Sequence, residues 1–273
     1  LKRSIFLSAE KNRLQIFRKL IKLENDDVNL LNCNNDSLLF IAVKNKSKDI
    51  ISEILKNPKF DSNKSCILNA FMETIINNNN ESINIINELY DYDKENDHLI
   101  DFTKLLPNGK SFFTSIASTN LFENEEDGFD DIDYVGKIDL INVGEIAAFL
   151  LEHGVDPNKP DNEGFLPFEY AILLNSFDFV NVLINSNKVD YSQKVKTKMN
   201  FFRLYQNQYI YTISLSDAKW MTYLQLAARS SNSEILKKFI DKKLNDINST
   251  NDVGENALFE ACRVSNFKNV GPK

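Results

Sequence analysis

The chain of 273 residues has few of the residues that build catalytic and metal-binding centres. It contains two histidines and three cysteines, and no two cysteines form a CxxC pair. Zinc sites and Cys–His nucleophilic centres need these residues at characteristic spacings, so neither is expected. The eight glycines are too dispersed for a phosphate-binding loop or a dinucleotide-binding fingerprint. The sequence therefore predicts no catalysis, no cofactor and no metal site.

Long apolar runs and an excess of positive charge are also missing. No stretch of eighteen apolar residues is present, so no membrane insertion is expected, and charges interrupt the one N-terminal segment that could act as an export signal. The formal net charge of −7 weakens nonspecific attraction to nucleic acid and to anionic membranes. Together with the scattered cysteines, these features predict an intracellular, cytoplasmic protein, with the nucleus left open.

What the sequence does contain is an internal repeat. The stretch TYLQLA (222–227) aligns with SIFLSA (4–9), SLLFIA (37–42), LPFEYA (166–171) and NALFEA (256–261). The first two terminal Ala residues are 33 positions apart and the last two are 34 apart, while the longer gap before Ala227 equals one period plus an insertion of 23. The sequence therefore predicts about seven copies. Their anchor residues are Ala9, Ala42, Ile75, Ile116, Ala171, Ala227 and Ala261.

Each copy has the pattern of two short helices. After the anchor comes a polar turn and then a second apolar group, for example Ile50, Ile51, Ile54 and Leu55. Spacings of one, three and four place such side chains on one helical face. Neither helix can bury this face within its own copy, so the copies must stack as a solenoid. Turn-forming residues, as in HGVDPNKPDNEG (153–164), separate the copies.

The stretch DNEGFLPFEYAILLNSFDFVNVLI (161–184), preceded by LLEHGVDPN, resembles the ankyrin repeat. In the copy that begins TYLQLA, Thr222 is expected to cap the first helix. Tyr223 and Gln225 stand where this family has the Pro and His of its Thr-Pro-Leu-His-x-Ala pattern. Trp220 stands where the family has a glycine, so this finger turn is expected to be remodelled.

The resemblance covers nearly the whole chain and is weakest at 64–118. It implies an all-α, ankyrin-like helical-pair solenoid of about seven repeats, with short finger turns and two insertions. A HEAT-like array is the rival fold, but its units are longer than 33 residues. The predicted domain is a single solenoid, 1–273, with approximate repeats 1–31, 32–64, 65–105, 106–159, 160–191, 217–250 and an incomplete 251–273.

The first insertion, 119–140, is acidic, with seven carboxylates between positions 123 and 133. This composition is typical of a self-repelling surface loop, and the alternative is an acidic contact for a basic partner or a cation. The second insertion, 192–216, is an inserted finger that mixes basic and aromatic residues. Alternation in QYIYTISL (208–215) predicts an extended strand or an enlarged hairpin.

The predicted function is a non-catalytic protein–protein interaction scaffold, or the recognition arm of a larger polypeptide, that binds through its concave face and fingers. The start at Leu1 suggests a piece of a longer protein. One alternative is therefore a regulatory or substrate-recruiting segment of a multidomain enzyme whose catalytic domain lies outside this chain. A nucleic-acid binder acting through 192–216 is less favoured, because aromatics in an insertion more often pack on their host. The oligomeric state and the identity of the protein partner stay open.

The candidate contact residues are those at the variable slots of the repeat and in the inserted finger. Phe165, Leu173 and Leu174 are the candidate hot spot, because desolvated apolar side chains dominate interface energetics. The alternative is that the two leucines pack against the neighbouring copy or the insertion. The full candidate set is Asn162, Glu163, Phe165, Leu173, Leu174, Lys219, Met221, Arg229, Asp252, Val253, Glu255, Arg263, Arg203, Tyr205 and Tyr209.

If these residues form the contact surface, the double substitution Phe165→Ala with Arg229→Glu should abolish partner capture. The helical content and the melting temperature should stay unchanged, because surface side chains contribute little to folding. Affinity capture and circular dichroism on the same variant test both parts of this expectation.

Overall fold

The computed structural model describes residues 1–77, 81–96, 98–118, 143–173, 176–196, 203–205, 208–210, 220–230 and 233–268. For residues 77, 117–118, 196, 203–205, 208–210 and 263–268 within these ranges, only the backbone is described. The described chain forms thirteen helices and two short antiparallel strand pairs, which confirms the all-α expectation. By its contacts the chain divides into two compact units, residues 1–104 with 140–146 and residues 105–139 with 147–273.

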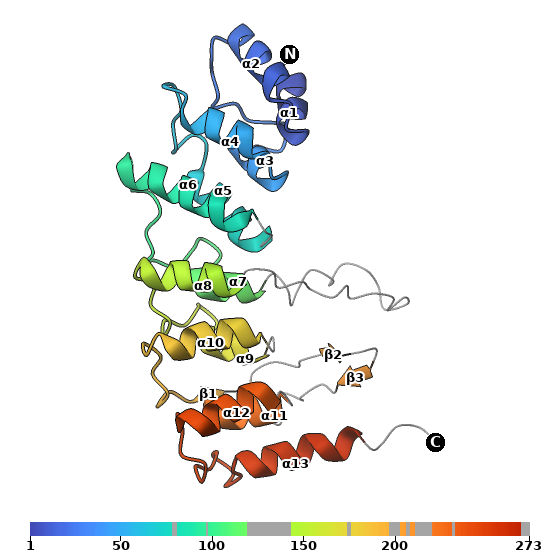
Figure 1. Ribbon diagram of the computed structural model, residues 1–273, viewed down its shortest axis with the longest axis vertical. Helices are drawn as coiled ribbons and strands as arrows, with labels where there is room; N and C mark the ends of the chain where they lie inside the picture. The colour runs from blue at the N-terminus through green and yellow to red at the C-terminus, as the bar shows by residue number, and fades with distance from the viewer. Residues whose placement is uncertain are drawn as a thin grey trace. The chain divides into compact units, whose positions relative to one another are not determined.

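The first unit contains three successive helix pairs (Figure 1). They are α1 (Lys2–Glu10) with α2 (Leu14–Leu23), α3 (Leu38–Lys44) with α4 (Lys48–Leu55), and α5 (Ile67–Asn77) with α6 (Ser82–Glu95). The first helices α1, α3 and α5 pack side by side in one layer, and the second helices α2, α4 and α6 form the other. Each of the first three predicted repeat ranges encloses one of these pairs.

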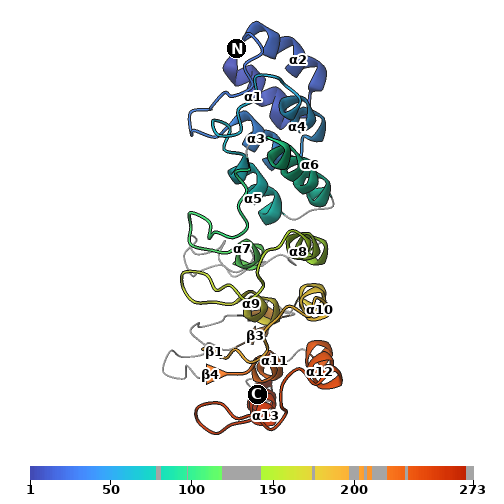
Figure 2. The same ribbon diagram turned by 90° about the vertical axis from the view of Figure 1, so that its left-hand side faces the viewer.

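The second unit continues the same pattern. Its helices are α7 (Phe112–Ser118), α8 (Val143–Glu152) from residue 147 onward, α9 (Pro167–Leu173), α10 (Phe177–Asn185), α11 (Tyr223–Arg229), α12 (Ser233–Lys242) and α13 (Ala257–Lys268). The strands are β1 (Val195–Lys196), β2 (Arg203–Tyr205), β3 (Gln208–Ile210) and β4 (Trp220–Met221). Figure 2 shows α7, α9, α11 and α13 in one column, and α10 beside α12 in another.

The repeat anchors lie in the core. A small side chain at this position lets neighbouring first helices approach closely, and interiors packed in this way contain few voids. The two isoleucine anchors are accommodated as well, since both are buried. The buried anchors are Ala9, Ala42, Ile75, Ile116, Ala171 and Ala227, whereas Ala261 in α13 is half-buried.

Thr222 caps α11, as expected. Its Oγ1 accepts a hydrogen bond from the backbone N–H of Gln225 (3.3 Å). The side-chain Oε1 of Gln225 accepts one from the backbone N–H of Thr222 (2.8 Å), which completes a capping box. The same Gln225 donates through Nε2 to the carbonyl oxygens of Ser249 (2.8 Å) and Glu255 (3.0 Å). One buried amide therefore ties the start of α11 to the turn that precedes α13.

Asparagine side chains join successive turns in both units. Asn29 Nδ2 donates to the Lys59 carbonyl (2.6 Å), while Asn29 Oδ1 accepts from the Asp61 N–H (2.8 Å). Asn158 makes the same two bonds, both 2.8 Å, to residues 30 and 32 positions further along the chain. Each side-chain amide thus hydrogen-bonds to one backbone N–H and one backbone carbonyl of the next turn, so neither backbone group is left without a partner.

In four repeats the turn before the first helix contains a left-handed residue. Gly109, Gly164 and Gly254 have φ angles of 79°, 83° and 83° there, and Asn35 takes the position with φ 64°. These are residues that enter the left-handed region at low cost. Trp220 holds this position before α11 and is instead extended in β4. The structure therefore confirms that this finger is remodelled.

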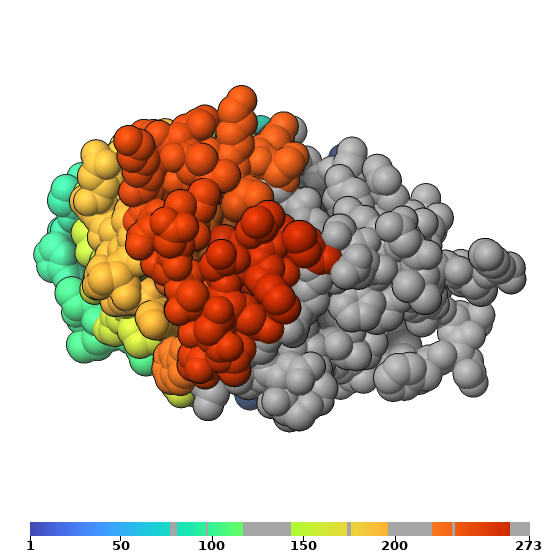
Figure 3. All heavy atoms as spheres, turned by 90° about the horizontal axis from the view of Figure 1, so that it is seen from below, coloured from blue at the N-terminus to red at the C-terminus, as the bar shows by residue number. Residues whose placement is uncertain are grey.

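Figure 3 shows the end of the second unit at α13. Leu258 is 71% exposed and Phe259 is 52% exposed on this helix. Residues at the repeat position of Leu258, such as Leu39, Phe168 and Leu224, are buried. Those three lie in first helices that have another first helix on each side, whereas no described helix follows α13.

The amide of Gln225 gives a direct test of the link between repeats. Gln225→Leu keeps the side-chain volume but leaves two carbonyls and one N–H without this partner, so the free energy of unfolding should fall by about 2 kcal/mol. Urea denaturation followed by circular dichroism measures this change. Gln15→Leu, at an exposed position of α2, is the matched control and should change stability by less than about 0.5 kcal/mol. An equal effect of both substitutions would contradict the role assigned to Gln225.

Candidate protein-binding edge

A short strand pair closes the base of the insertion at 192–216. β1 and β4 are antiparallel, with Val195 opposite Met221 and Lys196 opposite Trp220. The Val195 and Met221 side chains are buried, so the pair is fixed by apolar packing as well as by the strand hydrogen bonds. The two ends of the insertion are therefore held together at the edge of the second unit.

Inside the insertion, β2 and β3 form a second antiparallel pair. Arg203 lies opposite Ile210, Leu204 opposite Tyr209, and Tyr205 opposite Gln208. β3 covers the first three residues of the segment 208–215, for which the alternation predicts an extended strand or an enlarged hairpin, and residues 211–215 lie outside the described residues. The side chains of the candidate contacts Arg203, Tyr205 and Tyr209 lie outside the described residues, as does the whole acidic insertion at 119–140.

Trp220 is the exposed residue at the base of this insertion. Trp220 is 46% exposed, and its backbone N–H donates to Asp252 Oδ1 (3.3 Å), which ties β4 to the turn before α13. On that turn Val253 is 59% exposed. We define the finger edge as β4 together with the turns 161–164 and 251–255. Figure 2 shows these turns on the same side of the second unit as β1 and β4.

The turn 161–164 is held by hydrogen bonds and presents polar side chains. Asp161 is buried, and its Oδ1 accepts hydrogen bonds from the N–H groups of Glu163 (3.0 Å) and Phe165 (2.9 Å). The Asn162 N–H donates to the Gly109 carbonyl (2.9 Å), which links this turn to the preceding one. The side chains of Asn162 and Glu163 are exposed, in agreement with their assignment to variable slots.

A half-buried lysine, Lys110, and a buried tyrosine, Tyr170, lie next to this turn. Burial lowers the pKa of Lys110, and the neighbouring carboxylates of Glu163 and Asp161 act in the opposite direction. Burial, followed by the charge of Asp161, raises the pKa of Tyr170 far above its usual value. The Tyr170 hydroxyl donates to Asp161 Oδ2 (3.3 Å), so the phenol stays protonated and serves as a structural donor.

The structure corrects the expectation that Phe165 and Met221 are presented to solvent. Phe165 is 3% exposed, with its ring 5.4 Å from that of Tyr170, and Met221 is 0% exposed. Each follows the turn residue directly, so its side chain points into the repeat rather than out of the finger. Leu173 is half-buried, and Leu174 lies outside the described residues, as does Lys219.

Arg229 is a structural residue rather than an open contact. Its side chain is 13% exposed, with Nη1 at 3.9 Å from Glu260 Oε2 and at 3.8 Å from Met221 Sδ. Glu260 is fully buried, and its Oε1 accepts from Asn251 Nδ2 (3.3 Å). Because Phe165 and Arg229 are both enclosed, the double substitution at these positions should lower the melting temperature, contrary to the expectation from sequence.

The remaining candidates divide between open and structural positions. Asp252 is exposed, whereas Glu255 is half-buried and bound through its N–H and Oε2 to Asn251. Arg263 lies in α13, and its side chain is outside the described residues. Trp220 is exposed but is not among the contacts predicted from the sequence, where it marks only a departure from the glycine pattern. The available signal was a large aromatic residue at a turn position.

Solved structures identify the fold. The chain matches the ankyrin repeat domain of human ASB11 at 16% identity, with a TM-score of 0.56, covering 98% of this chain and 99% of that domain. It also matches the ankyrin repeat domain of Bcl-3, a member of the IkappaB protein family, at 14% identity and a TM-score of 0.57, covering 94% and 92%. No family model and no curated protein matches the sequence. The chain therefore has the ankyrin-repeat fold, as its residues predicted.

Metal-binding clusters and membrane-spanning helices are both absent from the part of the chain that the structure describes. No three His, Cys, Asp or Glu side chains gather there in a group that could hold a metal ion. None of the described helices combines the length and the apolar character needed to cross a membrane.

Mutation can test whether Arg229 and Glu260 stabilise the fold as a pair. Arg229→Met removes the positive charge beside a fully buried carboxylate, so the free energy of unfolding should fall by about 3 kcal/mol. Adding Glu260→Gln removes the buried negative charge, and the double variant should recover at least half of that loss. Urea unfolding of the two single variants and the double variant gives the coupling energy. Additive losses would show that the two groups do not act as a pair.

Proposed function

We propose that this chain is a non-catalytic protein-binding module whose partner docks on the finger edge of the second unit. The observation that carries the proposal is the replacement of a glycine turn by β4, which leaves Trp220 46% exposed above the buried Val195–Met221 pair. Solenoids of stacked repeats offer extended surfaces for partners, and the ankyrin-repeat fold supports this use.

The chemistry of the finger edge matches the anatomy of a protein interface. Trp220 and Val253 are exposed apolar side chains on two elements that the Trp220–Asp252 hydrogen bond joins. Exposed polar side chains of Asn162, Glu163 and Asp252 lie on the turns of the same edge. Interfaces combine an apolar centre, in which Trp is enriched, with a polar rim. The edge therefore supplies both parts on a rigid scaffold.

We place this binding role inside the cell. Cys33 and Cys66 are exposed thiols in the first unit, and exposed thiols persist in reducing compartments. The partner is a protein, and the exposed tryptophan and valine favour one that presents an apolar side chain to the edge.

The proposal is tested by substituting the two apolar residues of the edge. Trp220→Ala with Val253→Asp should weaken capture of protein partners from a cell extract by at least about 10-fold, because both anchors are lost. Trp220 is the only tryptophan of the chain, so its fluorescence reports directly on this edge. Addition of a purified captured partner should shift its emission, and the dissociation constant follows from the titration.

Two controls make the outcome decisive. Trp220→Phe keeps a large aromatic ring and should retain most of the binding, while circular dichroism shows that each variant is folded. Asp49→Asn, at an exposed position of the first unit, should leave capture unchanged. If the double variant captures the same proteins as the wild type, or if partner binding leaves Trp220 emission unchanged, the finger edge is not the binding surface.

A further inference from the structure

The second helices of the repeats share two outward positions seven residues apart. In α2 these positions hold Ile16 and Leu23, which precede and follow the buried pair Phe17 and Ile21. The 33-residue period and the buried residues of each second helix give the equivalent positions elsewhere. They are Asp49 in α4 and Lys56 directly after α4, Asn84 and Asp91 in α6, Glu145 and Glu152 in α8, Asp178 and Asn185 in α10, and Glu234 and Asp241 in α12.

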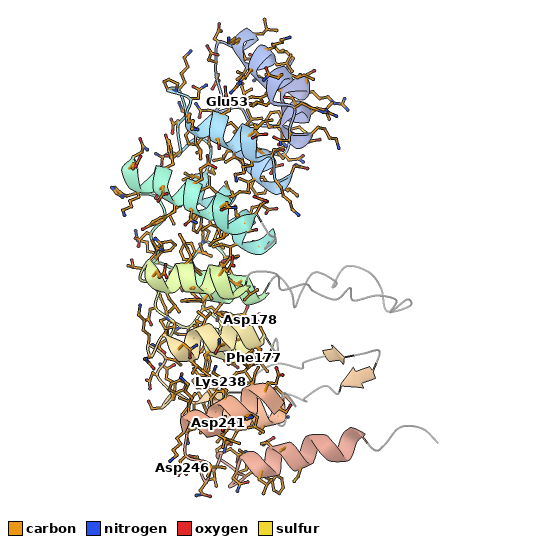
Figure 4. The ribbon with its side chains drawn as sticks, in the orientation of Figure 1. Glu53, Phe177, Asp178, Lys238, Asp241 and Asp246 are labelled. Carbon is orange, nitrogen blue, oxygen red and sulfur yellow. The ribbon has the colours of Figure 1, made fainter. Side chains whose placement is uncertain are left out.

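Every one of these equivalents is polar or charged, and every one is exposed. Figure 4 labels two of them, Asp178 on α10 and Asp241 on α12. Only α2 carries apolar residues at both positions, where Ile16 is 52% exposed and Leu23 is 69% exposed. The internal comparison therefore shows that this apolar pair is not required by the fold.

A further repeat stacked on α2 would not explain the pair. The equivalent residues of α4 stay exposed although this helix packs against both α2 and α6. Position in the repeat therefore directs these side chains to solvent rather than toward a neighbouring second helix. Exposed apolar side chains at positions that elsewhere are polar are typical of an interaction site.

The segment of the chain that carries this pair is rich in basic residues. Residues 1–24 contain seven Lys and Arg side chains and two Glu, in a chain whose net charge is −7. Arg18 is engaged by Glu53 through Nε–Oε1 (3.0 Å) and Nη2–Oε2 (2.8 Å) contacts to α4. Lys19 lies on the same helical face as Ile16 and Leu23. The basic side chains, all exposed, are Lys2, Arg3, Lys11, Arg13, Arg18, Lys19 and Lys22.

We propose that the outer face of α2, formed by Ile16, Lys19 and Leu23, docks an acidic amphipathic helix of a protein partner. Two anchors seven residues apart span about 10 Å along α2, a distance that apolar residues spaced i, i+3 and i+7 on a partner helix can match. The surplus of cations in residues 1–24 selects carboxylates on that helix. A membrane is less well matched, because interfacial helices carry a wide apolar face and α2 exposes two large apolar residues.

The probe is a fluorescein-labelled synthetic helix of about 18 residues, with Leu at i, i+3 and i+7 spacing and Glu on the opposite face. Fluorescence anisotropy with the full chain should give a dissociation constant of about 10 μM that weakens as salt rises. Ile16→Glu with Leu23→Asp introduces the residues that α12 carries at these positions, so the variant should fold normally. Its affinity for the probe should be at least about 10-fold lower.

Matched variants separate the apolar and the charged contributions. Ile16→Leu should retain binding, and Lys19→Glu should weaken it and reduce its dependence on salt. Asp178→Asn with Asp241→Asn, at the equivalent positions of α10 and α12, should have no effect. Circular dichroism confirms folding, and if the double variant is unfolded, Lys19→Glu alone decides the charge requirement.

Four results would overturn the proposal. They are failure of the wild-type chain to bind the probe, equal binding by Ile16→Glu/Leu23→Asp, equal affinity for a probe with Lys in place of Glu, and binding to phosphatidylserine vesicles without binding to the probe. The surface lies in the first unit and the finger edge in the second. Loss of binding at one therefore does not predict loss at the other.

Discussion

No repeat of this chain can bury its own apolar face, and the rest of the structure depends on that constraint. A first helix of seven to twelve residues gains little stability alone, so its apolar side chains are covered by the first helices of neighbouring repeats. The buried alanines set how closely those helices approach. Polar links such as the amides of Gln225 and Asn158 then satisfy the turn groups that this stacking encloses.

The features of the fold that follow from local chemistry could be predicted from the sequence. Apolar spacings of one, three and four residues predicted the helix pairs, Thr222 predicted a cap, and Trp220 at a glycine position indicated a remodelled turn. Each of these features depends on residues close together in the chain. The sequence could not indicate that the insertion is clasped by β1 and β4, because this pairing joins residues separated by the whole insertion.

The candidate site was less predictable for a related reason. Asn162 and Glu163 lie on a turn whose exposure follows from its own residues, and both are exposed. Whether Phe165 or Arg229 faces solvent depends on the neighbouring turn and helix, and both side chains are enclosed. In a repeat protein the exposure of a side chain can be predicted better, because equivalent positions of the other repeats show which residues the fold requires and which it does not.

The pairing of Val195 with Met221 has a consequence for how such a protein can change over time. The host repeats are joined to the insertion through a clasp of two residues from each strand, which brings its two ends together. Lengthening a loop whose ends are already joined adds only slowly to its closure entropy. The residues between the strands can therefore be lengthened, shortened or exchanged while the repeats keep their packing. The clasp therefore separates the packed repeats from a segment whose length can change without disturbing them.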